Sequence, residues 1–304
     1  SLLTHPSSTH KREDRAFSGG RAPSLGRPMT TDRRALLLWS GVPEGTQPTA
    51  AILLVGNELL SAKIRDENAW FIVQVMRRCG VQVREIRTVP DEEEVIADAA
   101  RALIRRADVV FSSGGVGPTH DDVTLAGIAR GTDRLLERHA GMEKILRGHY
   151  GDRITPDALR MADLPAGTTL TGEAGWPIMR LDVPTPESAR GSTTLYILPG
   201  IPSLLRAKVE TLESTPGALP RGDSWLLHTV ETEHAESAIA EGLREIAAAH
   251  PAVDIGSYPR WRADDSGRLQ VQVRITVEAP RAAADQVHAV LGHIEAHLAA
   301  LASR

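Results

Sequence analysis

The segment SSGGVGPTHDDVT, Ser112–Thr124, is a glycine-rich stretch between a predicted strand and a predicted helix. A short apolar run at 108–111 precedes it, and the β-branched residues of that run predict a buried strand. The residues after it, 123–129, predict the first turns of a helix. A strand, a glycine-rich turn and a helix start together expose a row of backbone N–H groups to an anion. Because glycine permits close approach and positive φ, we expect a phosphate to contact Gly114, Gly115 and Gly117.

Two adjacent aspartates, Asp121 and Asp122, follow the glycines. Their carboxylates are the oxygen ligands that a hard divalent cation such as Mg²⁺ prefers. The alternative is a plain tight turn in which Asp122 or Thr124 caps the following helix. Because the two acids stand at the end of a strand and beside three glycines, we favour a phosphate or cofactor site over the plain turn.

Length, charge and cysteine content limit the kinds of protein to which this chain can belong. A chain of 304 residues predicts one large or two ordinary domains. A net charge of −4, without a basic and aromatic stretch, argues against a nucleic-acid partner. The single cysteine, Cys79, excludes an internal disulfide and suits a reducing compartment, so we expect a cytoplasmic protein. No apolar run reaches the length of a membrane span, so we expect no membrane partner.

Residues 1–48 are expected to form a disordered leader. They are rich in Ser, Gly, Pro, Thr and Arg and show no sustained apolar period. Such a segment buries too little surface to offset the entropy lost on ordering. The pair Arg33-Arg34 precedes an apolar run at 35–39 that is too short for an export signal, while an arginine-rich organelle leader stays open.

Strand and helix patterns alternate from residue 49 onward, which predicts an α/β domain over 49–215 with a mostly parallel sheet and helices on both faces. The run 51–55 is apolar throughout, the pattern of a strand covered on both sides. Further strands are expected over 81–89, 108–111 and 193–198, and helices over 66–76, 90–104, 138–150, 156–162 and 202–213.

Ligands of such sheets bind at the carboxyl ends of the strands. Polar residues of three loops would converge there, namely Glu58, Asp91 and Gly114–Asp122. Asp66 opens a helix and is either its N-cap or a ligand contact. The turn Pro199–Pro202 is either a further wall of the same pocket, which would include Gly200, or a plain strand-to-helix turn.

After a linker expected at 216–222, residues 223–304 predict a small α+β domain. Its third strand, 269–277, alternates strictly between apolar and polar residues and so predicts a half-buried antiparallel strand. The other expected elements are strands over 225–231 and 253–257 and helices over 236–249 and 287–301, with both helices on one face of the sheet. Because no acid or cysteine nearby is expected to serve as a third ligand, we interpret the histidines of the last helix as a solvated face rather than a metal site: His288, His293 and His297.

Several separated motifs together resemble one known superfamily. In chain order they are GNELL (Gly56–Leu60), DxN (Asp66–Asn68), GGVGPTHDDVT (Gly114–Thr124), LPGIP (Leu198–Pro202) and IGSYPRW (Ile255–Trp261). The third resembles the signature of the MoaB/Mog-like molybdopterin-binding domain superfamily. The first, second and fourth are similar to the branch shared by competence-damage-inducible protein A and the amino-terminal domain of eukaryotic FAD synthase. The last looks like the second module of the FAD synthase branch, and the resemblance implies a three-layer α/β/α fold.

The resemblance also implies which residues bind the ligand. The superfamily pocket uses the glycine turn and the aspartate of the Asp-Val-Thr motif, here Gly114, Gly115 and Asp122, and a second aspartate, here Asp91. From the same motifs we expect ligand contacts at Gly117, Thr119, Asp66, Asn68 and Gly200. Members of the branch are associated with hydrolysis of the pyrophosphate in ADP-ribose or FAD that depends on a divalent metal such as Mg, Mn or Co. One departure is Ser61-Ala62, which stands where the branch often has glycine.

These residues suit the chemistry that the resemblance implies. Cleavage of a pyrophosphate needs charge neutralisation, an aligned water and a stabilised leaving phosphate. Backbone N–H groups of Gly114–Gly117 would supply the first, together with a cation held by Asp122, Asp121 or Asp91. Glu58 or His120 would position or deprotonate the water. The expected catalytic residues are therefore Asp122, Asp91 and Glu58, and the expected metal ligands are Asp121, Asp122 and Asp91.

Three hypotheses of function follow from the sequence. The first is a metal-dependent pyrophosphatase that acts on a dinucleotide or nucleotide-sugar such as FAD or ADP-ribose. The second is a non-catalytic binder of a pterin or nucleotide. The third is a regulatory or scaffolding chain that is like FAD synthase but has neither its adenylyltransferase domain nor turnover. Each has a phosphorylated small molecule as its partner, and a homo-oligomer is compatible with all three.

Overall fold

The computed structural model describes residues 47–303 except 173–175, 187, 189 and 264–268. The leader expected at 1–48 therefore lies outside the described residues, apart from Gln47 and Pro48. Within the described residues, no helix is both long enough and apolar enough to cross a membrane.

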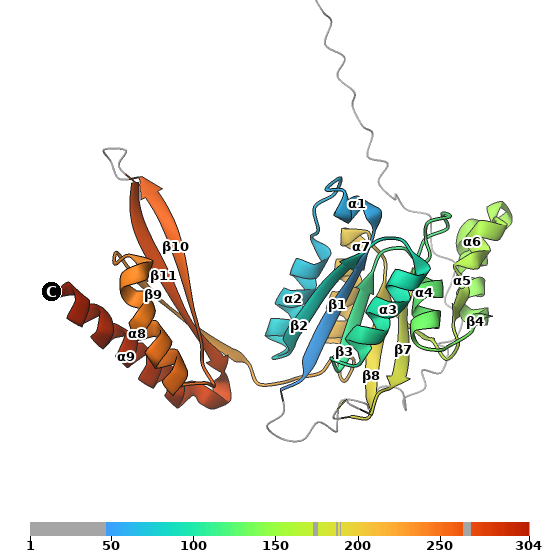
Figure 1. Cartoon of the computed structure of the whole chain (residues 1–304). Coiled ribbons are helices and arrows are strands. Elements are labelled where there is room, and N and C mark those ends of the chain that lie inside the picture. The colour runs from blue at the N-terminus through green and yellow to red at the C-terminus, as the bar shows by residue number, and fades with distance from the viewer. Residues whose placement is uncertain (1–46, 173–175, 187, 189, 264–268, 304) are drawn as a thin grey trace, which may run out of the picture. The chain divides into compact units, whose positions relative to one another are not determined.

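A six-stranded sheet with the order β2-β1-β3-β8-β7-β6 forms the centre of the first domain (Figure 1). Strands β2, β1, β3 and β8 run parallel, and β7 and β6 continue the sheet antiparallel. In chain order the strands are β1 (Thr49–Val55), β2 (Gln82–Val89), β3 (Val109–Ser113), β6 (Thr169–Thr171), β7 (Ile178–Pro184) and β8 (Ser192–Leu198). The mostly parallel sheet that the alternating pattern predicts is confirmed.

Helices cover both faces of this sheet (Figure 1). A separate two-stranded sheet is made of β4 (Leu136–Arg138) and β5 (Asp163–Pro165). The helices are α1 (Asn57–Leu60), α2 (Asn68–Arg78), α3 (Glu93–Ile104), α4 (Thr124–Gly131), α5 (Ala140–Tyr150), the 3-10 turn η1 (Gly151–Arg153), α6 (Pro156–Arg160) and α7 (Pro202–Ser214).

Side chains of the central strand β1 enter two separate cores, because successive residues of a strand point to opposite faces. Leu53 and Val55 pack into the core that contains the apolar residues of α3, α4 and α5. Ile52 and Leu54 pack into the core shared with α2 and α7. Both faces of β1 are therefore buried, which explains the unbroken apolar run and confirms the three-layer α/β/α arrangement.

The segment expected as a linker, 216–222, is packed against the first domain. Ala218 and Leu219 are buried in the core beneath α2 and α7. The hydroxyl of Tyr196 donates a hydrogen bond to the carbonyl oxygen of Ala218. The Pro and Gly residues of this segment indicate that the chain changes direction there. They do not indicate whether the segment packs against a domain.

The second domain is an antiparallel sheet, in the order β10-β11-β9, with two helices on one face. Val273, Ile275 and Val277 of β11 are fully buried against apolar residues of α8 and α9, as the strict alternation predicts. Its elements are β9 (Trp225–Thr232), α8 (Glu236–Ala249), β10 (Asp254–Ala263), β11 (Leu269–Pro280), the 3-10 turn η2 (Arg281–Ala283) and α9 (Ala284–Ala302).

Strand β10 is longer than the expected strand over 253–257. It continues through Pro259 to Ala263. Proline lacks the N–H that a central strand needs and is tolerated at the edge of a sheet. Because β10 is an edge strand, Pro259 does not end it.

Candidate ligand-binding site

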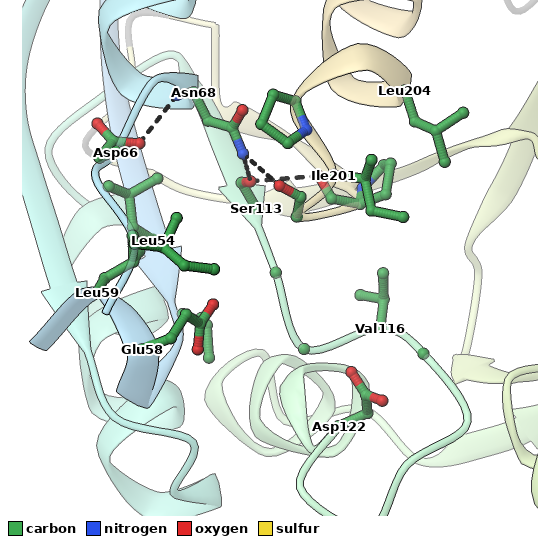
Figure 2. A pocket seen from close by; sticks show the side chains of 18 of the residues that line it. Leu54, Glu58, Leu59, Asp66, Asn68, Ser113, Val116, Asp122, Ile201 and Leu204 are labelled. Atoms are coloured by element: carbon green, nitrogen blue, oxygen red, sulfur yellow. Dashed lines mark hydrogen bonds between the residues drawn. The ribbon is translucent and has the colours of Figure 1, made fainter. Parts of the chain in front are cut away.

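A pocket of about 550 Å³ lies at the carboxyl ends of the parallel strands β1, β3 and β8 (Figure 2). It contains the residues that follow each of these strands, including the glycine turn after β3 and Gly200 after β8. Its apolar wall includes Leu54, Leu59, Val116, Met161, Ile201 and Leu204. The turn at Pro199–Pro202 is thus a wall of the same pocket, one of the two alternatives that the sequence leaves open.

Backbone geometry requires glycine at two positions of the turn. Gly114 and Gly115 have φ angles of 103° and 62°, a region that other residues rarely adopt. A Cβ atom on Gly114 would lie 2.1 Å from the carbonyl oxygen of Val55, and one on Gly115 would lie 2.3 Å from Oγ1 of Thr124. At these two positions the turn therefore lines the pocket with backbone alone.

The N–H groups of the turn differ in what they are free to bind. The N–H of Gly114 donates to the carbonyl oxygen of Leu198 at 3.3 Å, so it is already occupied. For the N–H groups of Gly115, Val116 and Gly117, no acceptor is found within the described part of the chain. These three N–H groups therefore have no acceptor among the described residues, which leaves their expected contact with a phosphate a prediction.

Asp122 lines the pocket and is fixed by Thr119. One of its carboxylate oxygens accepts hydrogen bonds from the N–H and the hydroxyl of Thr119, at 2.8 and 2.5 Å. The helix α4 begins at Thr124, and its N-cap, Val123, makes no side-chain cap bond. Helix capping by Asp122 or Thr124 is therefore not the role of either residue. The carboxylate instead holds the loop that carries it.

The neighbouring residues of the motif lie outside the pocket wall. Thr119, His120 and Asp121 are exposed, and none of them lines the pocket. The hydroxyl of Thr119 is 2.6 Å from a carboxylate oxygen of Asp121, a hydrogen bond that lowers the pKa of this carboxyl. Because a hydroxyl has one proton to donate, the Thr119 hydroxyl donates to the carboxylate of either Asp121 or Asp122 at any one time. Thr119 thus holds the Asp122 carboxylate by hydrogen bonds from outside the pocket wall.

Glu58 is the second acid that faces the glycine turn. Its half-buried side chain folds back over Gly56, where a Cβ atom would lie 2.4 Å from Oε1. Figure 2 shows the carboxyl groups of Glu58 and Asp122 on opposite sides of the turn that runs past Val116. Two carboxylates therefore line the pocket together with the glycine turn.

Asp91 does not line the pocket. Its carboxylate accepts a hydrogen bond of 2.8 Å from the N–H of Asn57, the first residue of α1. It therefore anchors the helix that carries Glu58. Among the described residues, no group of three or more His, Cys, Asp or Glu side chains is arranged to hold a metal ion. The structure does not bring the expected ligands Asp121, Asp122 and Asp91 together into one such group.

Asp66 and Asn68 both line the pocket and shape its rim. The carboxylate of Asp66 accepts from the N–H groups of Asn68 and Ala69, at 2.9 and 3.2 Å, and so caps the start of α2. The amide of Asn68 donates to Oγ of Ser113 and to the carbonyl oxygen of Gly200, at 3.0 and 2.7 Å. Asp66 therefore has the capping role at the wall of the pocket, and its expected ligand contact stays a prediction.

The pocket also contains residues that no motif indicates. Arg65, which precedes the capping aspartate, lines the pocket, and so do Tyr150 and Trp176 from a less regular part of the sequence. The carboxylates that line the pocket are Glu58, Asp66, Glu67 and Asp122. Acids outnumber bases at this site, so the pocket is electronegative.

Two family matches divide the chain in the same way as the fold. Residues 51–215 match the family described as "probable molybdopterin binding domain", and residues 224–302 match "FAD synthase, middle domain". A protein of Aeropyrum pernix is 33% identical over 246 residues, which cover 76% of this chain and 86% of that protein. A CinA-like protein of Frankia casuarinae is 33% identical over 244 residues, which cover 76% of this chain and 54% of that relative.

Two solved structures are also similar to this chain. The crystal structure of CinA from Thermoplasma acidophilum, a protein described as of unknown function, has a TM-score of 0.48 and 30% identity, over 54% of this chain and 96% of that one. The tungsten cofactor synthesizing protein MoaB from Pyrococcus furiosus has a TM-score of 0.38 and 16% identity, over 56% of this chain and 92% of that one. The first family match spans more than half of the 304 residues. The chain therefore belongs to the molybdopterin binding domain family, and a domain of the FAD synthase middle-domain family follows in the same chain.

Proposed function

We propose that the pocket binds the pyrophosphate of a dinucleotide or nucleotide-sugar together with a divalent cation, and hydrolyses it. The observation that carries this proposal is the placement of two carboxylates, Glu58 and Asp122, on either side of the glycine turn. The N–H groups at 115–117 suit phosphate oxygens, and the carboxylates suit a cation. FAD and ADP-ribose are the substrates that the family resemblance suggests.

The charge of the pocket explains why the phosphate needs a cation. Among the described residues that line the pocket, Glu67 is paired with Arg206, and the other three carboxylates stand against the single guanidinium of Arg65. A phosphate brought near these carboxylates is repelled, because like charges repel at short range. A bare phosphate would therefore be disfavoured, although the N–H groups of the turn would attract it. A phosphate that enters with a divalent cation satisfies both the N–H groups and the acids.

The donor set fits a hard divalent cation, with Mg²⁺, Mn²⁺ and Co²⁺ as the candidates. Mg²⁺ keeps several waters and is held by one or two carboxylates plus the phosphates of its substrate. Asp122 and Glu58 supply that number of carboxylates at the pocket wall. When bound, such a cation neutralises charge on the phosphates and on the leaving oxygen.

Each residue then has a defined role. Asp122, held by Thr119, would hold the cation, and the N–H groups at 115–117 would bind the charge that develops on the phosphate oxygens. Glu58 accepts a proton from the attacking water, a role open to it because His120 is outside the pocket wall. The water oxygen bonds to one phosphorus and the P–O–P bond breaks. FAD would yield AMP and FMN, and ADP-ribose would yield AMP and ribose 5-phosphate.

A second candidate is a protein that binds molybdopterin or a nucleotide without turnover. Two observations favour it: the family description names molybdopterin, and the apolar wall with Trp176 and Met161 suits any flat heteroaromatic ring. This candidate uses the same pocket and the same glycine turn. It differs only in assigning no proton transfer to Glu58.

One experiment separates the two candidates. The purified chain is incubated with FAD, ADP-ribose or NAD plus Mg²⁺, Mn²⁺ or Co²⁺, and AMP is measured by chromatography while binding is measured by calorimetry. The first candidate predicts AMP with metal and none with EDTA. Metal-dependent binding without AMP would support the second candidate. Absence of both binding and AMP would refute both.

A further inference from the structure

The loop between α1 and α2 has a defined backbone path. The N–H groups of Lys63 and Ile64 both donate to the carbonyl oxygen of Glu58, at 3.0 and 3.3 Å. Ala62 adopts a positive φ of 56°, which is costly for a residue with a Cβ atom. The chain therefore keeps this turn shape without the glycine that favours it, and the loop stays tied to the helix that carries Glu58.

The far end of the same loop is also anchored. The carboxylate of Asp66 accepts a hydrogen bond from the backbone N–H of Asn68. The side-chain amide of Asn68 in turn donates to Oγ of Ser113 and to the carbonyl oxygen of Gly200 at the pocket rim. Arg65 stands between these two anchored points, and it lines the pocket. Its backbone is thus held at the site before any ligand arrives.

Among the described residues that line the pocket, Arg65 is the single base. The acids closest to it in sequence already have partners: Asp66 caps α2, and Glu67 forms an ion pair of 2.8 Å with Arg206. Across the described residues, no hydrogen bond or ion pair of the Arg65 side chain is found. An exposed arginine that lines an acidic pocket, and for which no side-chain partner is found in the described chain, is available to an anionic ligand.

We propose that Arg65 binds the second phosphate of the pyrophosphate and thereby selects dinucleotides and nucleotide-sugars over mononucleotides. This inference rests on the proposed function, in which the glycine turn, with Asp122 and Glu58, binds the first phosphate and its cation. A second phosphate bears its own negative charge, which that cation offsets only in part. Guanidinium groups bind phosphate through two parallel hydrogen bonds, and these give geometric selection as well as attraction.

The test compares one loop variant with a matched control in the full chain. Arg65→Gln removes the charge at the pocket, and Lys63→Gln removes the same charge from the same loop at a residue that does not line the pocket. Calorimetry with Mg²⁺ gives Kd for ADP-ribose and for AMP. Arg65→Gln is expected to weaken ADP-ribose binding about 10- to 100-fold, the range for a charged hydrogen bond, and AMP binding less than about threefold. Lys63→Gln is expected to change both by less than about twofold.

Each other outcome has a definite meaning. Equal loss of ADP-ribose and AMP affinity in Arg65→Gln would overturn the assignment to the second phosphate. So would equal losses in the two variants, because these would show a general effect of loop charge. Unchanged ADP-ribose affinity in Arg65→Gln would overturn it while leaving the proposed function intact. If the unaltered chain binds neither compound, the proposed function fails and this inference fails with it.

Discussion

The side-chain amide of Asn68 donates a hydrogen bond of 2.7 Å to the carbonyl oxygen of Gly200, which lies 132 residues further along the chain. The same nitrogen lies 3.0 Å from Oγ of Ser113. One buried amide therefore joins the start of α2, the end of β3 and the turn before α7 (Figure 2). These three elements form one side of the pocket, so the amide fixes their spacing.

Replacement of Asn68 by aspartate tests this junction. Asn68→Asp puts a carboxylate, which only accepts, opposite two oxygens that now receive a hydrogen from the amide. We expect a loss of about 2 to 3 kcal/mol in the free energy of unfolding by urea, together with weaker binding of ADP-ribose. Gln74→Glu, at an exposed position of α2, makes the same charge change and should alter stability by less than about 0.5 kcal/mol. Equal stability of the two variants would show that the junction contributes nothing.

The positive φ at Gly115 gives a second prediction. Gly115→Ala would strain the backbone at φ 62° and place a Cβ atom against Thr124, which is buried. We expect a loss of about 2 kcal/mol or more in stability. Gly148→Ala is the control, because its Cβ would meet nothing within 4 Å in α5, and it should gain about 0.5 to 1 kcal/mol. A Gly115→Ala protein as stable as Gly148→Ala would contradict the geometry of the turn.

Alkaline stability gives a third prediction. Burial raises the pKa of Tyr196 to about 12, above the ordinary value of 10.0. Because the unfolded chain loses this proton first, the stability that the neutral phenol contributes is complete below pH 10 and is lost as the pH rises to 12. The stability difference between the unaltered chain and Tyr196→Phe should therefore fall by about 2 kcal/mol across this range, measured by urea unfolding. A difference that stays constant with pH would contradict the burial of a titrating phenol.

The residues of the site that directly follow parallel strands can be predicted from the sequence. Glu58, Gly115 and Asp122 meet in one pocket because each follows a parallel strand, and the carboxyl ends of such strands share an edge. The alternation of strands with helices is enough to predict that convergence. The buried run at 51–55 likewise predicts that both faces of β1 are covered.

Other features depend on contacts that no local pattern encodes. Asp91 resembles a ligand residue in sequence, yet its carboxylate is used by the N–H of Asn57. Asp122 precedes a helix, yet it bonds Thr119 rather than the helix N-terminus. Arg65 and Trp176 reach the pocket only because the chain folds them there, so neither spacing nor composition indicates them.

Asp122 is the residue on which the proposed hydrolysis depends most. Asp122→Asn preserves an oxygen that accepts from Thr119, so we expect the fold and its stability to be retained. The variant removes the negative charge that would face the proposed cation, and removal of one such charge-stabilising group costs about 3 kcal/mol at the transition state. Asp121→Asn is the matched control, because it removes an adjacent charge, also bonded to Thr119, that does not line the pocket.

The most direct measurement is the rate of AMP release from ADP-ribose with Mg²⁺ by the unaltered chain, Asp122→Asn and Asp121→Asn, each checked for an unchanged melting temperature. We predict that Asp122→Asn lowers the rate on the order of a hundredfold or more, as loss of one charge-stabilising group would, whereas Asp121→Asn changes it less than about threefold. Metal-dependent release that is as fast in Asp122→Asn as in the unaltered chain would contradict the assignment of this pocket.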